Sequence, residues 1–133
     1  MILVDTHVLI WMDTGDRRLG RTSRELIESN WATGSVGASA LTFWEIGLLC
    51  ERGRFRPARP LTEWRNTWLV AGLVEMPLDG VIATRALDLS GLSPDPADRF
   101  IAATAMLSGA TLLTADARML DWQHPLARQD ARI

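Results

Sequence analysis

Residues 95–116 read DPADRFIAATAMLSGATLLTAD, and they place a helical run, a glycine and a short apolar strand between acidic positions. The opening Asp-Pro pair suits a helix start, because an acidic cap followed by proline fits the first turn. The helix is expected to run to about Ser108 and to stop at Gly109. Residues 111–114 then form a strand, and Asp116 follows its carboxyl end. This stretch predicts one helix–strand unit of a parallel sheet.

The same alternation extends through the rest of the chain. Further strands are expected at residues 2–4, 35–39 and 73–77, with an edge strand in the tail. Helices are expected at residues 7–12, 22–30, 42–52, 61–71, 81–89 and 117–122. Strands separated by helices predict an α/β domain of three layers, with a mainly parallel central sheet flanked by helices. At 133 residues the chain is near the common domain size of about 100–150 residues, so one domain over 1–133 is expected.

Composition narrows the class of protein. No apolar run reaches the roughly 18 residues that a membrane span needs, so no membrane partner is expected. Cys50 is the one cysteine, which argues against an internal disulfide and against a cysteine-based zinc site. The first residues lack the basic stretch of a signal peptide, so a cytoplasmic location is expected.

The charge balance does not resemble that of a nucleic-acid binder. The formal net charge is −2, whereas nonspecific binding to phosphates normally depends on net positive charge. The balance changes if some carboxylates bind a metal ion, because a bound cation reverses the local sign. All 14 basic residues are arginine, which we attribute to genomic composition bias.

Four acidic residues each lie beside an apolar run: Asp5, Glu45, Asp98 and Asp116. In an open α/β sheet, ligands bind outside the carboxyl ends of the strands. Carboxylates gathered there repel one another unless a divalent cation neutralises them. The four acids therefore predict a metal site.

Each acid also has a simpler explanation. Thr42 and Glu45 have the spacing of a capping box, in which both side chains stabilise a helix start. Asp98 falls in the first turn of its helix, where a carboxylate contributes about 0.5–1 kcal/mol. Asp5 and Asp116 are also suited to turns, with Thr6 as a possible cap of the following helix. The shared edge of the sheet favours the metal site over four separate explanations.

Four motifs in order resemble the PIN-domain ribonucleases, specifically the VapC-type toxins of bacterial toxin–antitoxin pairs. They are DTHVLIW at residues 5–11, SALTFWEI at 39–46, DPADRFIAATA at 95–105 and LLTAD at 112–116. The similarity covers essentially the whole chain. It implies a single PIN domain over 1–133 with the three-layer PIN-like fold.

By this resemblance Asp5, Glu45, Asp98 and Asp116 are the metal-binding and catalytic residues. The implied reaction is hydrolysis of RNA phosphodiesters with Mg²⁺ or Mn²⁺, hard cations that prefer oxygen ligands. Thr114 matches a hydroxyl residue that orders the site, and Thr6 is expected to play a similar part. The neighbouring polar residues are expected to lie outside the set of ligands, either as structural supports or at the surface: Asp95, Arg99, Asp121, His7 and His124.

The resemblance also implies partners: an RNA substrate, a cognate antitoxin protein and a second copy of the chain in a homodimer. RNA contacts are expected in two arginine-rich loops, at Arg52, Arg54 and Arg56 (with Phe55 and Arg59), and at Arg17 and Arg18 (with Arg21 and Arg24). Either loop alone is equally consistent with a solvated surface. One departure from the family is Leu49, where members with this motif commonly carry a lysine that contacts phosphate.

Three other classes of protein are alternatives to this interpretation. A haloacid-dehalogenase-like phosphatase needs a second aspartate two residues after the first, where this chain has His7. A response-regulator receiver domain needs a lysine late in the chain, and this chain has none. A non-catalytic PIN-fold regulator that binds RNA or protein is the remaining alternative.

Overall fold

A computed structural model describes all residues, 1–133. Its five strands form one sheet in the order β3-β2-β1-β4-β5, and every neighbouring pair is parallel. The strands are β1 (Ile2–Val4), β2 (Val36–Ser39), β3 (Val74–Met76), β4 (Thr111–Thr114) and β5 (Arg128–Asp130). The predicted parallel sheet is confirmed, as is the edge strand in the tail.

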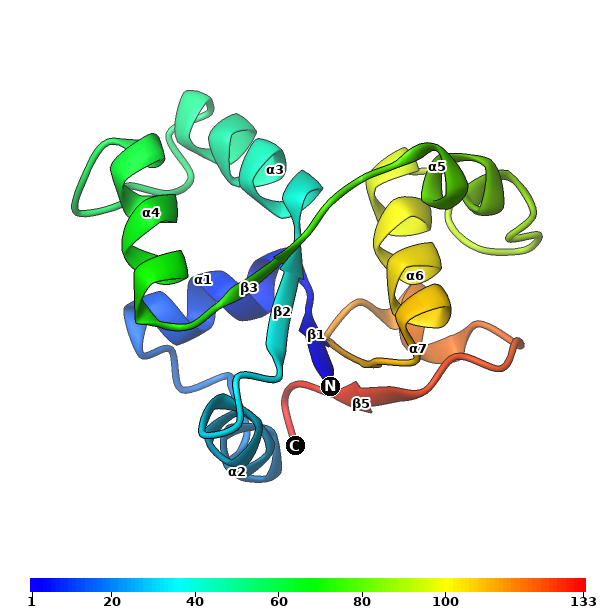
Figure 1. The fold of residues 1–133 in the computed structure, drawn as a ribbon, viewed down its shortest axis with the longest axis horizontal. Helices are drawn as coiled ribbons and strands as arrows, with labels where there is room; N and C mark the ends of the chain where they lie inside the picture. Colours follow the sequence, from blue (N-terminus) through cyan, green and yellow to red (C-terminus); the bar gives the residue numbers. More distant parts are fainter.

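Seven helices cover the two faces of the sheet. They are α1 (Thr6–Thr14), α2 (Arg21–Trp31), α3 (Ala40–Glu51), α4 (Leu61–Ala71), α5 (Gly80–Leu87), α6 (Pro96–Ser108) and α7 (Ala117–Asp121). Figure 1 shows α1, α3 and α4 on one side of the strands and α5 and α6 on the other. The predicted three-layer arrangement is confirmed. None of these helices is long and apolar enough to cross a membrane.

The core consists of two apolar clusters, one on each face of the sheet. Ile2 and Val4 belong to the cluster under α1 to α4, whereas Leu3 belongs to the cluster under α5 to α7. In β4, Leu113 belongs to the first of these clusters and Leu112 to the second. Successive side chains of a strand point to opposite faces, so these short apolar runs supply both layers.

The order of the strands places a crevice between β1 and β4. From β1 the chain adds β2 and β3 on one side, and then returns to add β4 and β5 on the other. Helices that follow β1 and β4 therefore leave toward different faces. Such a switch point is where open α/β sheets bind ligands, at the carboxyl ends of the strands.

Two predicted helix starts are wrong. Asp5, and not Thr6, is the N-cap of α1, and its side chain accepts a hydrogen bond from the Thr6 backbone N–H. Helix α3 begins at Ala40 with Ser39 as its N-cap, so Thr42 and Glu45 lie inside the helix. The capping-box explanation of Glu45 is thereby excluded.

The start of α6 is as predicted. The Asp95 side chain accepts a hydrogen bond from Ala97 N–H, Pro96 occupies the first turn, and Asp98 is the third helical residue. Gly109 ends the helix with a φ of 67°, in the left-handed region that glycine adopts without steric cost.

Candidate active site

All four predicted acids line one cavity of about 300 Å³ at the switch point. Asp5 follows β1, Asp116 follows β4, Glu45 comes from α3 and Asp98 from the first turn of α6. The remaining walls are supplied by Thr6, His7, Trp11, Asp95 and Ala115. Residues that are up to 111 positions apart in sequence thus meet in one place, as the sequence predicts.

Asp5 is the most enclosed of the four carboxylates, with 8% of its surface exposed. One carboxylate oxygen accepts the Thr6 backbone N–H at 2.8 Å, and the other accepts the Thr114 hydroxyl at 2.6 Å. Burial raises the pKa of Asp5, and the charge of Asp116 raises it further, while the two hydrogen bonds and His7 act in the opposite direction. Thr114 therefore lies where it can orient the Asp5 carboxylate.

Glu45 accepts a hydrogen bond from Thr6, the other hydroxyl residue that was expected near the site. Thr6 Oγ1 donates to the Glu45 carboxylate at 2.5 Å and lies 3.2 Å from the hydroxyl oxygen of Thr42. Burial raises the pKa of Glu45 to about 7, with further contributions from the charges of Asp5, Asp95 and Asp98. A carboxyl group with this pKa is close to half-protonated at neutral pH.

Asp98 and Asp116 are the other two acids of the cavity. Asp98 is 9% exposed, and burial raises its pKa to about 6, with further increases from Asp116, Asp95 and Asp5. Asp116 caps α7 by accepting the Arg118 N–H at 2.8 Å, and its own N–H donates to Thr114 Oγ1 at 3.1 Å. Thr114 thus connects the acids that follow the two central strands.

The cavity has an uncompensated negative charge. None of its carboxylates forms an ion pair with an arginine, and the four ion pairs of the molecule lie elsewhere. The carboxylates line the cavity without converging on one point, since no three acidic, histidine or cysteine side chains are close enough together to hold one metal ion. Their oxygen atoms are the ligands that hard divalent cations prefer, so a cation would relieve the repulsion by drawing them together.

Asp95 is nearer to the site than expected. It was predicted to support the helix, and it does so, but it also lines the cavity and adds a fifth negative charge. Arg99 has the expected structural part, because its guanidinium donates to the backbone carbonyls of Ser93 and Ala86. His7 is exposed at the cavity wall, and Asp121 lies outside it.

None of the predicted RNA-binding arginines lines the acidic cavity. Arg52, Arg54 and Arg56 are exposed in the loop after α3 and do not line the acidic cavity. Arg17 is exposed, and Arg18 pairs with Asp16 at 2.7 Å. The Arg18 guanidinium also lies 5.0 Å from the centre of the Trp11 ring.

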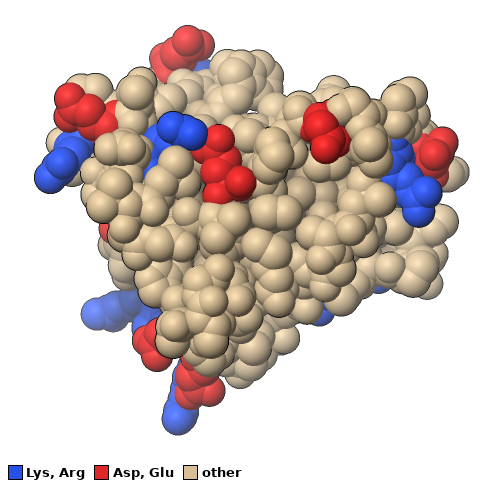
Figure 2. Space-filling view, viewed as in Figure 1, with Lys and Arg blue, Asp and Glu red and all other residues tan.

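Basic side chains do not gather into a stripe on the face drawn in Figure 2. That face is mostly uncharged, and its charged groups are scattered, most of them at the periphery.

Three residues near the site were not predicted as site residues: Thr42, which was expected only to cap a helix, Ser93 and Arg118. Thr42 contacts the Thr6 hydroxyl, and Ser93 lies between Arg118 and the start of α6. The only signal in the sequence was that each lies within three residues of an acid of the cavity. Other residues lie equally close to those acids, so this signal does not single out the three.

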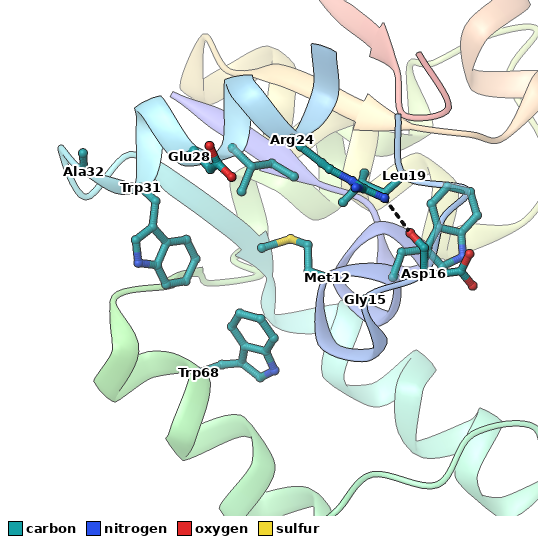
Figure 3. Close-up of a pocket in the computed structure, with 11 residues that line it drawn as sticks. Met12, Gly15, Asp16, Leu19, Arg24, Glu28, Trp31, Ala32 and Trp68 are labelled. Atoms are coloured by element: carbon teal, nitrogen blue, oxygen red, sulfur yellow. Dashed lines mark hydrogen bonds between the residues drawn. The ribbon is translucent and has the colours of Figure 1, made fainter. Parts of the chain in front are cut away.

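A larger cavity shares one wall residue with the acidic one. It has a volume of about 580 Å³ and is a mainly apolar groove between α1, α2 and α4, which we call the aromatic groove. Figure 3 shows Met12 between Trp31 and Trp68 on one side and the Arg24–Asp16 contact on the other. Trp11 belongs to the walls of both cavities.

The fold agrees with comparison to known proteins. The PIN domain family matches over residues 2–123. The chain belongs to the PIN-domain family. This PIN domain is 30% identical to Ribonuclease VapC22 of Mycobacterium tuberculosis over 125 residues, which cover 93% of each chain.

Solved structures show the same fold. A toxin–antitoxin complex from Klebsiella pneumoniae contains a chain with a TM-score of 0.68 and 20% identity, matched over 98% of both chains. VapBC2 from Rickettsia felis, bound to a DNA fragment from its promoter, gives a TM-score of 0.70 at 15% identity, over 97% of this PIN domain and 98% of that chain. FitAcB from Neisseria gonorrhoeae gives a TM-score of 0.63 at 19% identity, over 98% of both chains.

Proposed function

We propose that this PIN domain is a metal-dependent endoribonuclease that hydrolyses RNA phosphodiester bonds as the toxin of a toxin–antitoxin pair. The observation that carries the proposal is the cavity at the switch point, where four carboxylates gather with no cationic partner. The 30% identical relative is named a ribonuclease, and the similar solved structures are described as toxin–antitoxin proteins, which supports the same assignment.

Asp5, Glu45, Asp98 and Asp116 are the residues that would hold Mg²⁺ or Mn²⁺. Their chemistry fits these ions, because all four offer carboxylate oxygens and no sulfur or imidazole ligand competes in that set. When bound, such an ion polarises the phosphodiester and stabilises the charge that develops during hydrolysis.

The residues around the acids prepare the site for this task. Thr114 orients Asp5, and Thr6 orients Glu45, each by donating a hydroxyl hydrogen bond to a carboxylate oxygen. Hydrogen bonds of this kind fix the direction of ligand oxygens and tune their basicity. Before a cation binds, Glu45 can take up or release a proton near neutral pH, because its pKa is raised to about 7.

The proposal includes a cognate antitoxin as the partner that controls the toxin. The aromatic groove is a candidate contact surface, because it exposes apolar side chains beside the acidic cavity. A homodimer is also proposed, and the exposed apolar residues on the helices are candidates for its interface: Trp44, Val70, Val81, Leu87 and Leu107. The arginines of the two predicted loops remain candidates for RNA contacts, and the cytoplasm remains the expected location.

One observation favours the alternative of a non-catalytic PIN-fold regulator that binds RNA or protein. The carboxylates line the cavity but do not converge in the way that a ready-made metal site requires. The two functions differ in whether a divalent cation brings about hydrolysis.

The test is RNA cleavage by the purified chain, free of any partner. Total cellular RNA is incubated with Mg²⁺ or Mn²⁺, with and without EDTA, beside the Asp5→Asn variant. We expect discrete fragments that disappear with EDTA and with the variant. Metal binding in calorimetry without any cleavage would support the non-catalytic regulator, and cleavage that persists in EDTA would contradict the metal-dependent mechanism.

A further inference from the structure

A second polar cavity lies beside the acidic one. It has a volume of about 520 Å³ and is formed by the loop at residues 90–94 on one side and by Arg118 and residues 121–124 on the other. Only two of its ten lining residues are hydrophobic. Its volume is within the range of about 300–1,000 Å³ that is typical of small-ligand sites. We call it the flanking cavity.

The two cavities have no lining residue in common, but their walls come from neighbouring residues of the same two segments. Ser93 and Pro94 line the flanking cavity, and Asp95, the next residue, lines the acidic one. Likewise Asp116 lines the acidic cavity, and Arg118 lines the flanking one. A polymer whose cleaved bond lies at the acids therefore has the flanking cavity as an adjoining space for a neighbouring residue.

Arg118 is fixed at this boundary. Its guanidinium donates to the Ser93 hydroxyl at 2.8 Å, and its backbone N–H donates to the Asp116 carboxylate at 2.8 Å. Ser93 is 4% exposed, so the guanidinium of the otherwise exposed Arg118 side chain is held by a buried residue.

The Ser93 hydroxyl also links Arg118 to the acids. Its oxygen accepts the Asp95 N–H at 3.1 Å as well as the Arg118 guanidinium, which occupies both acceptor positions. The same hydroxyl thus holds both the Arg118 guanidinium and the backbone at the N-cap of α6.

Arg118 has unused capacity to bind an anion. It forms no ion pair, and the bond to Ser93 is the one side-chain hydrogen bond that it makes. A guanidinium group has five N–H donors in a planar arrangement that matches phosphate oxygens. Its anchor, the Ser93 hydroxyl, also accepts a hydrogen bond from the Asp95 N–H at the start of α6, beside the acidic cavity.

An aromatic pair lies at the other side of the flanking cavity. The His124 ring stacks on Trp122 with 4.4 Å between centroids and a tilt of 31°. Trp122 is buried and donates its indole N–H to the Ser90 carbonyl at 3.0 Å, so it is a fixed base for the exposed imidazole. An exposed, supported ring is a stacking surface for a nucleobase.

We propose that the flanking cavity binds a nucleotide of single-stranded RNA adjacent to the cleaved bond, with Arg118 contacting a phosphate and His124 stacking on the base. The proposal rests on the proposed ribonuclease function and deepens it by assigning a substrate subsite. Asp121 also lines the cavity, so its carboxylate opposes the bound phosphate.

The test measures binding of a short labelled single-stranded RNA of mixed sequence to the full chain carrying Asp5→Asn, over a range of salt concentrations. In this background we expect Arg118→Gln to weaken binding about tenfold and to lower the salt slope by about one. His124→Ala should weaken binding about fivefold or more through lost stacking. Asp121→Asn should strengthen binding, because it removes a repelling charge.

Two controls separate a phosphate contact from a structural part. Arg85→Gln removes the same charge from an exposed position on α5 outside both cavities, and it should change affinity much less. Ser93→Ala removes the anchor but keeps the Arg118 charge, so it should lower affinity without lowering the salt slope. Melting temperatures of all variants are measured alongside.

The outcomes for the subsite and for the nuclease are distinct. Equal effects of Arg118→Gln and Arg85→Gln, or an unchanged salt slope with Arg118→Gln, overturn the subsite even when the native chain cleaves RNA. Loss of RNA binding specific to Arg118 in a chain that never cleaves RNA supports the subsite and overturns the nuclease. No RNA binding by the Asp5→Asn chain overturns the subsite.

Discussion

The aromatic groove and the acidic cavity share Trp11 but differ in nearly everything else. The groove measures about 580 Å³, and seven of its 11 lining residues are hydrophobic. The acidic cavity measures about 300 Å³, and only two of its nine lining residues are hydrophobic. The larger space is not where the reactive groups lie.

The difference follows from how each surface gains free energy. The groove leaves apolar area in water, and covering it with another apolar surface is favourable by about 25 cal/mol per Å². The acidic cavity holds carboxylates whose charges are disfavoured by burial and by one another, so it gains most from a cation. The aromatic groove is thus the candidate surface for a protein partner, and the acidic cavity is the candidate site of a reaction.

The sharpest test of this separation is Asp98→Asn. We expect RNA cleavage to fall more than about a hundredfold, beyond the roughly 10–100-fold effect of a residue that only supports a metal ligand. The melting temperature should change little, because loss of a helix-terminal charge, about 0.3–1 kcal/mol, is offset by relief of a buried one. Cleavage and thermal melting are measured with Asp88→Asn, an exposed residue after α5, as the control. A large fall in melting temperature with cleavage retained would show that Asp98 is only a helix-terminal residue.

The reverse test alters the groove and leaves the acids alone. Ala32→Glu places a carboxylate at the exposed rim, and we expect affinity for the cognate antitoxin to fall at least about thirtyfold, in the range of interface hot spots. RNA cleavage should be unchanged. Thr33→Glu adds the same charge one residue later, outside the lining of the groove, and is the control for co-purification. Equal losses with both variants would remove the groove as the antitoxin surface.

A third test addresses the hydroxyl that connects two acids. Thr114→Val keeps the shape of the side chain but removes the donor to Asp5 and the acceptor for the Asp116 N–H. We expect cleavage to fall about 10–100-fold, with stability lower by roughly 1–3 kcal/mol because two buried groups lose a partner. Thr111→Val, in the same strand and without a side-chain hydrogen bond, should change neither quantity appreciably. Activity equal to that of the native chain would contradict the orienting role of Thr114.

The smallest expected effect concerns the dependence of stability on pH. The pKa of Glu45 is raised from its ordinary value of 4.5 to about 7, so between these values the folded chain binds more protons than the unfolded chain. The contribution of Glu45 to stability is therefore greatest at low pH and falls as pH rises from about 4.5 to about 7.

Glu45→Gln should remove this fall in stability with rising pH. Without divalent metal, the variant should melt at a higher temperature than the native chain at pH 8, and the difference should shrink at pH 5. Glu51→Gln, exposed near the end of the same helix, should show no such trend. Adding Mg²⁺ or Mn²⁺ should narrow the gap at pH 8 by stabilising only the native acidic site. A difference that is constant with pH would contradict the assignment.

Local signals explain why much of the fold was predictable. Short apolar runs mark the strands because a parallel sheet is buried on both faces, as Leu112 and Leu113 illustrate. The Asp95-Pro96 start and the Gly109 end of α6 are fixed by backbone chemistry within a few residues. The same kind of signal misled at Thr42 and Glu45, because their spacing suits a capping box but the helix starts earlier, at Ser39 and Ala40.

The sequence by itself determined the alternation of strands and helices, the candidate acids and the family, because each depends on residue type and spacing along the chain. Only the tertiary structure decided which groups meet. Thr6 with Glu45, Thr114 with Asp5 and Ser93 with Arg118 are contacts between segments 25 to 109 residues apart. Such contacts are set by the packing of helices on the sheet, and their hydrogen bonds leave no periodic trace in the sequence.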